Sequence, residues 1–230
     1  MSHNKQIVKS RGVTRLCHFT KSSNFPYILG EGKEESNGLI SNQKVKEAQF
    51  LSLNDLNRYD GRPELICTSL QYPNFFFFDK SRKNNLDNLL SDWVIILISP
   101  EIIDENTYFC PVNAATQKGK YISRGSDSFE KLLAIEIENS KASPRNFEMA
   151  SNVPTDNQAE LLFENDIPKE AIIGLVFSSK EQAIVERLRL KLCNVSLDGI
   201  GIYFSNKWYD KHSAYELING HEIPLTELEE

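Results

Sequence analysis

The sequence DNQAELLF, residues 156–163, contains one carboxylate, Glu160, among apolar residues that favour burial. A short apolar run that follows polar turn residues is typical of a strand entering a core. Because side chains alternate along a strand, Glu160 shares one face with Gln158 and Leu162. The pattern therefore predicts a strand whose glutamate faces either a cleft or solvent, and alternation alone leaves both open.

Further strands and a few helices flank this segment along the chain. Apolar runs predict five more strands, which read RLCHFT (15–20), ELICTSLQY (64–72), DWVIILIS (92–99), AIIGLVFS (171–178) and GIGIYFS (199–205). Helices are predicted at NFPYILGEG (24–32), DSFEKLLAIEIEN (127–139) and KEQAIVERLRLKL (180–192). The last helix has apolar residues at helical spacing, which predicts a buried face of Ala183, Ile184, Leu188 and Leu192. Because strands outnumber helices without regular alternation, we predict an α+β fold with a mixed or antiparallel sheet and flanking helices.

Length and composition indicate one soluble globular domain. The chain has 230 residues, of which 40% are hydrophobic and 25% charged, so it can bury a substantial core, and we expect a single domain over residues 1–230. The N-terminal residues lack the apolar run of a secretory signal. The longest apolar run, WVIILI (93–98), is far shorter than the roughly 20 residues that span a bilayer. We therefore expect a cytoplasmic protein.

The cysteines and the net charge exclude some kinds of site. The four cysteines lie far apart, without the close pairs of zinc sites or redox motifs, so we expect buried, reduced thiols and no metal. A net charge of −6 argues against a protein that coats nucleic acid indiscriminately. It still permits a local basic track, and Lys118, Lys120 and Arg124 could form one along a nucleic-acid backbone.

Two more segments carry candidate chemistry. His18 and Thr20 are two residues apart in a predicted strand and so face the same side, although a lone histidine in a strand is more often structural. A polar turn that contains Arg58 precedes another strand, and four consecutive phenylalanines, residues 75–78, follow it. Some of these rings must be core, but an aromatic cluster beside an arginine also suits a flat heteroaromatic ring attached to a phosphate.

Several motifs occur in a fixed order along the chain. They are LCHFT (16–20), NDLNRYDGRPELICTSLQYPN (54–74), FCPVNAA (109–115), VPTDNQAELLF (153–163) and IPKEAIIGLVF (167–177). In this order they resemble the DarT-like toxins, which are ADP-ribosyltransferases that act on single-stranded DNA. The resemblance extends from about Arg15 to Phe177 and is specific because several ordered motifs agree. It is less distinct from Ser178 onward.

The resemblance implies an ADP-ribosyltransferase fold, in which a central cleft between two mixed sheets binds NAD as a substrate rather than as a redox carrier. It implies that Glu160 is the catalytic glutamate, that Arg58 is the catalytic arginine, and that residues 113–160 form the loop that presents the nucleic acid. It also implies a set of NAD-binding residues: His18, Phe19, Thr20, Tyr27, Ile40, Arg58, Ser69, Tyr72 and Phe76.

The implied activity is a toxin's transfer of ADP-ribose from NAD to a base in single-stranded DNA, with release of nicotinamide. A carboxylate near the ribose can stabilise developing positive charge and accept the proton of the attacking base, which suits Glu160. Arg58 either assists that step or binds a phosphate. Thymine is the first choice of acceptor and guanine the second, and the implied partner is a macrodomain-type antitoxin encoded nearby. The alternatives are an enzyme of the same fold that modifies RNA or protein, and a non-catalytic relative that binds NAD or nucleic acid.

Overall fold

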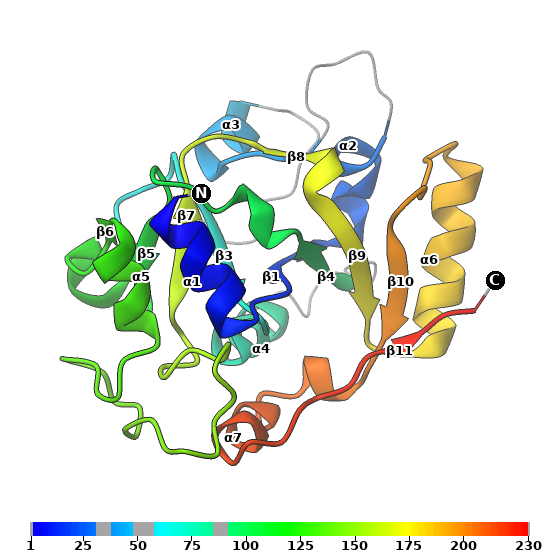
Figure 1. The fold of residues 1–230 in the computed structure, drawn as a ribbon. Coiled ribbons are helices and arrows are strands. Elements are labelled where there is room, and N and C mark those ends of the chain that lie inside the picture. The colour runs from blue at the N-terminus through cyan, green and yellow to red at the C-terminus, as the bar shows by residue number, and fades with distance from the viewer. Residues whose placement is uncertain (1, 31–37, 48–57, 85–91, 230) are drawn as a thin grey trace.

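A central mixed β-sheet organises the computed structural model, which describes residues 2–30, 38–47, 58–84 and 92–229 (Figure 1). In spatial order its strands are β11 (Thr226–Glu227), β10 (Gly201–Phe204), β9 (Ile172–Phe177), β4 (Trp93–Ile98), β1 (Leu16–Lys21), β3 (Ile66–Leu70), β7 (Glu160–Phe163), β5 (Tyr108–Cys110) and β6 (Ser123–Arg124). The short strands β2 (Gly38–Leu39) and β8 (Ile167–Pro168) form a separate pair. Strands β9 and β10 run parallel, and the other pairs are antiparallel. The predicted α+β class with a mixed sheet is confirmed.

The sheet consists of two halves that are joined over a short distance. Strands β1 and β3 share only two residue pairs, Leu16 with Leu70 and Cys17 with Ser69. Beyond Cys17, β1 pairs with β4 as far as Lys21, whereas β3 pairs with β7. The two halves therefore stop pairing between β1 and β3 beyond Cys17.

Helices cover the sheet and its edges. The α-helices are α1 (His3–Arg11), α2 (Phe25–Ile28), α3 (Asn42–Glu47), α4 (Phe75–Lys83), α5 (Ser126–Leu132), α6 (Lys180–Leu192) and α7 (Ser213–Ile218). The described residues also form five short 3-10 helices: η1 (Ser22–Asn24), η2 (Pro100–Ile102), η3 (Thr116–Gly119), η4 (Lys169–Ala171) and η5 (Lys207–Tyr209). Helix α6 lies beside β10 at one end of the molecule, and α5 lies beside β5 and β6 at the other (Figure 1). None of the described helices combines the length and apolar character that crossing a bilayer requires.

Helix α6 has the predicted bounds, but of its four apolar residues at helical spacing only Ala183 and Ile184 pack on the core. The Ser179 side chain caps it by accepting a hydrogen bond from the Gln182 amide. Its fully buried residues are Ala183, Glu186 and Leu190, whereas Leu188 and Leu192 are 53% and 84% exposed. The prediction of Leu188 and Leu192 as core was wrong. The buried face instead includes Glu186, whose charge is paired with Arg189 at 2.7 Å.

Other expectations need correction. The helix predicted over residues 127–139 ends at Leu132. There the Thr155 amide donates to the Leu132 carbonyl and the Thr155 hydroxyl donates to the Ala134 carbonyl, so these carbonyls have partners outside a helix. The four phenylalanines begin helix α4, where the Asn74 side chain accepts from the Phe77 amide. Helices α1 and α7 were not predicted, since each buries only two apolar side chains: Ile7 and Val8 in α1, and Ala214 and Leu217 in α7.

The predicted helix over residues 24–32 is a single turn, α2, and residues 31–32 lie outside the described residues. All four cysteines are free thiols, as expected. Cys17 and Cys110 are buried and Cys67 is partly buried, but burial was wrong for Cys193, which is exposed at the C-terminal end of α6.

Candidate active site

Glu160 is a buried carboxylate at the start of β7, where its side chain is held by neighbours on both sides. The residue is 7% exposed, so the interpretation of a solvent-facing glutamate is wrong. Its Oε1 accepts a hydrogen bond of 3.0 Å from the amide of Ala114, which belongs to the FCPVNAA motif after β5. The thiol of Cys67 on β3 also hydrogen-bonds the carboxylate. The position of Glu160 is thus fixed by the strands that flank β7.

The surroundings of Glu160 raise its pKa toward neutral pH. Burial raises the pKa of Glu160 to about 7, although the bonds from Ala114 and Cys67 and the charge of Arg58 oppose the shift. The nearby Asp60 carboxylate adds to the increase in pKa. A carboxyl group with a pKa near the working pH can exchange a proton during a reaction, which is the usual property of a general base.

Arg58 lies close enough to Glu160 to interact with its charge, and it is held by three hydrogen bonds. Its Nε and Nη2 donate to the two carboxylate oxygens of Asp60 at 3.0 and 2.6 Å, and Nη1 donates to the Leu65 carbonyl at 2.8 Å. Burial alone would lower the pKa of Arg58, but neighbouring Cys67, Asp60 and Glu160 outweigh it and raise the pKa. Arg58 is therefore a fixed cation. The preceding motif residues 54–57 lie outside the described residues.

His18 on β1 makes a hydrogen bond to β3 just beyond the point where the two strands stop pairing. Its Nδ1 lies 2.8 Å from the carbonyl oxygen of Cys67. Since a carbonyl only accepts, Nδ1 carries the proton. Burial lowers the pKa of His18, and the charge of Arg58 also disfavours protonation, so the ring is neutral with an electron pair on Nε2. The side chain can accept a hydrogen bond from a ligand hydroxyl.

Two other residues of the predicted NAD-binding set are buried, Thr20 on β1 and Ser69 on β3. The Thr20 hydroxyl accepts a hydrogen bond of 2.9 Å from the Asn24 side chain. The Ser69 hydroxyl donates to the Cys17 carbonyl at 3.4 Å, at the last pair that joins the two halves of the sheet. The partly buried Tyr27 lies on α2, and Ile40 follows β2.

The aromatic members of that set pack into a different part of the core. Phe19 contacts Phe78 with ring centroids 4.8 Å apart, and its ring also stacks against that of His18 at 6.4 Å. Tyr72 follows the C-terminal end of β3 and packs on Trp208 at 5.3 Å, whereas Cys67 lies near the start of that strand. Phe76 packs edge-on against Tyr215 of α7. Phe19 is thus linked to the site through His18, whereas Tyr72 and Phe76 pack against Trp208 and Tyr215. The role of the three rings in NAD binding stays a prediction.

The basic residues predicted to follow nucleic acid divide into two groups. Gly119 adopts φ +82°, and a Cβ there would lie 2.6 Å from the backbone oxygen of Asp60. The turn that carries Lys118 and Lys120 therefore rests directly on the turn that carries Arg58 and Asp60. Arg124 lies apart on β6, where it pairs with Glu164 at 2.6 Å and stacks on Tyr108.

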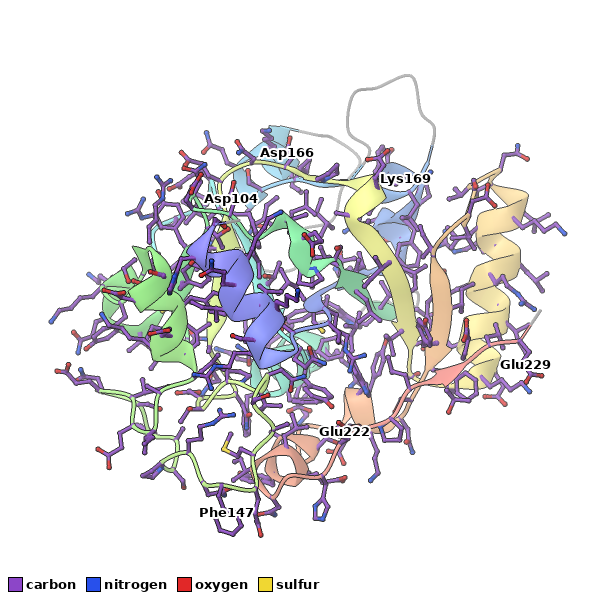
Figure 2. The ribbon with its side chains drawn as sticks, viewed as in Figure 1. Asp104, Phe147, Asp166, Lys169, Glu222 and Glu229 are labelled. Atoms are coloured by element: carbon purple, nitrogen blue, oxygen red, sulfur yellow. The ribbon has the colours of Figure 1, made fainter. Side chains whose placement is uncertain are left out.

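The rest of the segment that the resemblance assigns to nucleic-acid presentation is mostly irregular but well anchored. The Arg145 guanidinium donates to the carbonyls of Val153 and Ala150. Phe147 projects outward from this segment and is 96% exposed (Figure 2). Asn146 fixes the turn by accepting from the amides of Glu148 and Met149. An exposed ring on a fixed turn can stack on a base, and no periodic pattern of residues predicted it.

Sequence patterns did not identify the groups that hold Glu160 and Arg58. Asp60, Cys67 and the Ala114 amide were parts of quoted motifs, but no role was predicted for them. The one local signal was the Asp-Gly pair at residues 60–61, which is typical of a tight turn. Within the described part of the chain, no group of three or more His, Cys, Asp or Glu side chains could hold a metal ion.

Comparison with protein families gives one match over most of the chain. The family described as "ssDNA thymidine ADP-ribosyltransferase, DarT" matches residues 17–210. Among curated protein sequences, none matches the chain.

Solved structures share the fold at low sequence identity. Thermosipho africanus DarTG in complex with ADP-ribose has a TM-score of 0.59 and 14% identity, over 85% of this chain and 51% of that one. Thermus sp. 2.9 DarT in complex with NAD+ has a TM-score of 0.55 and 13% identity, over 85% and 97%. The same Thermus protein with ADP-ribosylated ssDNA has a TM-score of 0.54 and 11% identity, over 86% and 97%. The chain thus spans about half the length of the Thermosipho protein and nearly all of the Thermus protein.

Proposed function

Because the chain belongs to the DarT family of ssDNA thymidine ADP-ribosyltransferases, we propose that it transfers ADP-ribose from NAD to a base in single-stranded DNA and releases nicotinamide. The observation that carries the proposal is the buried Glu160, with a pKa of about 7, beside a fixed Arg58 cation. Thymine is the proposed acceptor, in line with the family description, and guanine is the second candidate.

Glu160 has two tasks in the proposed reaction. As the bond between nicotinamide and ribose breaks, its electron pair leaves with nicotinamide, which departs neutral, and positive charge develops on the ribose. The Glu160 carboxylate stabilises that charge. The attacking base nitrogen then forms its bond to the ribose carbon and loses a proton, which Glu160 accepts. No acid is needed for the leaving group, so one buried carboxylate is sufficient.

His18, Thr20 and Ser69 on β1 and β3 would hold the substrate in place. We assign the Nε2 atom of neutral His18 as an acceptor for a ribose hydroxyl, because its Nδ1 is already occupied by the Cys67 carbonyl. Thr20 and Ser69 lie on β1 and β3, the two strands that no longer pair beyond Cys17. The proposed NAD site retains Phe19, Tyr27, Ile40, Tyr72 and Phe76 as the family resemblance implies.

The transfer rate is expected to rise with pH up to about 7 and then to level off. Glu160 accepts a proton only when ionised, and burial raises its pKa to about 7. Below that value, each unit of pH should lower kcat about tenfold, because the ionised fraction falls in that proportion. The measurement is kcat of the wild type against pH, with saturating NAD and oligonucleotide. A kcat that stays constant far into the acid range would exclude Glu160 as the proton acceptor.

Replacing Lys118, Lys120 and Arg124 together with glutamine should weaken DNA binding equally for all sequences. Each phosphate contact that is lost should reduce the salt slope of the binding constant by about 0.7 for a single strand. Binding of a labelled oligonucleotide is measured over a range of salt concentrations. The matched control replaces Lys180, Arg187 and Lys191 on α6, at the other end of the sheet, and should leave the slope unchanged. Equal slopes in both variants would show that DNA lies elsewhere.

Labelled NAD tests the class of acceptor. NAD that carries the label in its ADP-ribose part is incubated with single-stranded DNA, RNA or polypeptide, and the incorporated label is counted. The proposal predicts label on DNA. Label on RNA or polypeptide alone would favour the alternative substrates of this fold, and no label on any acceptor would favour a non-catalytic binding protein.

The cellular role is proposed on the family resemblance. We propose a cytoplasmic toxin that is countered by a macrodomain-type antitoxin encoded nearby, and a single domain over residues 1–230.

A further inference from the structure

We propose that Asp60 is a positioning residue for the transfer reaction, which fixes the guanidinium of Arg58 beside Glu160 as a permanent hydrogen-bond donor. The inference rests on the proposed function, and it identifies Glu160 rather than Arg58 as the group that receives the proton of the acceptor base. Asp60 itself has no proposed contact with substrate.

The contact between the two side chains is bidentate and shielded from water. Both oxygens of Asp60 accept from Arg58, at 3.0 Å from Nε and 2.6 Å from Nη2. The two side chains are 3% and 11% exposed. Two parallel charge-assisted bonds in a water-poor site determine the plane of the guanidinium as well as its position. The hydrogen bond from Arg58 Nη1 to the Leu65 carbonyl holds the guanidinium at a third nitrogen.

Asp60 is itself immobilised, so it can act as a rigid support. Its Oδ1 also accepts from the Arg62 amide at 3.2 Å, and the Gly61 amide donates to the Arg58 carbonyl at 3.1 Å. From the other side, Gly119 approaches the Asp60 carbonyl so closely that a side chain would not fit. A supporting residue that is locked on both sides holds a reactive group more accurately than a free surface turn.

The arrangement decides which group takes the proton. A guanidinium that donates three of its five N–H groups to protein acceptors, two of them to a carboxylate, does not release a proton near neutral pH. Its positive charge acts on Glu160 at close range and favours the ionised form of that carboxylate. Arg58 therefore supplies charge and hydrogen bonds, and Glu160 remains as the base.

The variant Asp60→Asn tests the proposal with a small change of shape. Its Oδ1 can still accept from Arg58 Nε and from the Arg62 amide, but Nδ2 replaces the acceptor that faces Nη2, and the charge is lost. We expect kcat to fall by about 10- to 100-fold through misplacement of Arg58, with little change in KM for NAD. The matched control is Glu64→Gln, which removes the carboxylate of the exposed Arg62–Glu64 pair at 3.4 Å and should leave kcat unchanged.

A double-mutant cycle with Arg58→Gln separates positioning from general structural damage. If Asp60 acts through Arg58, the double variant should have the same kcat as Arg58→Gln alone, whereas independent damage would make the losses multiply. Multiplied losses, or wild-type kcat in Asp60→Asn, would overturn the proposal. If Asp60→Asn melts far below the wild type, Asp60→Glu replaces it, because it keeps the charge and moves the carboxylate by one methylene; an unchanged kcat there contradicts the proposal. Wild-type transfer is measured first, so its absence would refute the proposed function instead.

Discussion

Replacement of Glu160 with glutamine is expected to lower the rate of ADP-ribose transfer by about 10²- to 10⁴-fold, the usual cost of losing a general base and a stabilising charge. Glutamine can still accept the hydrogen bond from the Ala114 amide, so the fold and NAD binding should persist. Nicotinamide release and DNA labelling are the measurements. In a cell whose growth the wild type inhibits, the variant should be tolerated.

The control for this variant is Glu164→Gln, which removes an exposed carboxylate four residues along the chain that pairs with Arg124. It should transfer at nearly the wild-type rate. Near wild-type turnover in Glu160→Gln, or continued growth inhibition by an inactive variant, would contradict the assigned role.

The same substitution should also stabilise the protein at alkaline pH. Below pH 4.5, the ordinary pKa of a glutamate, Glu160 is protonated in both the folded and the unfolded state. Between that value and about 7, the unfolded state ionises while the folded state stays protonated, so stability falls as pH rises. Above about pH 7 the raised pKa of Glu160 lowers the free energy of unfolding by about 3 kcal/mol. Glu160→Gln should therefore melt above the wild type at about pH 8 and close to it at about pH 4.

Arg58→Gln is expected to lower kcat by about 10²- to 10³-fold, as the loss of a fixed cationic donor in a water-poor site usually does. The acid limb of the rate profile should also move above pH 7, because Arg58 lowers the pKa of Glu160 and that effect would be lost. The measurement is kcat against pH for the variant and the wild type. An unchanged limb would show that the two charges do not interact.

Two further variants complete the test of Arg58. Arg62→Gln is the control, since Arg62 is half exposed and should affect neither the rate nor its pH dependence. Arg58→Lys keeps a positive charge beside the buried Asp60, so it should remain folded even if Arg58→Gln does not. Lysine cannot form the bidentate contact, and a large fall in kcat is still expected. Wild-type kcat in Arg58→Lys would mean that charge alone is sufficient.

The sequence predicted much of the framework because its strands carry a strong local pattern. Alternation around Glu160 placed it on the face shared with Leu162, and the strand was found there. The helix over residues 180–192 was predicted from apolar residues at helical spacing, and the Ser179 side chain caps it in the structure. The family resemblance is confirmed by the match over residues 17–210, which extends beyond Phe177 and includes β10.

The remaining features depend on contacts between distant parts of the chain. The close approach of Gly119 to Asp60 joins turns that are far apart in sequence, and no local pattern encodes it. The tautomer of His18 follows from where β1 and β3 separate, which is a property of the assembled sheet. Apolar spacing likewise did not predict the burial of Glu186, which is paired with Arg189.

The most direct test of the central claim is the mass of a thymine-containing single-stranded oligonucleotide after incubation with NAD and the purified protein. The wild type should add the mass of one ADP-ribose group and release an equal amount of nicotinamide. Glu160→Gln should add none, and the matching duplex should be nearly inert, because extrusion of a paired base costs a few kcal/mol. An unmodified single strand, or equal modification by Glu160→Gln, would contradict the claim that this chain is a single-stranded DNA ADP-ribosyltransferase with Glu160 at its centre.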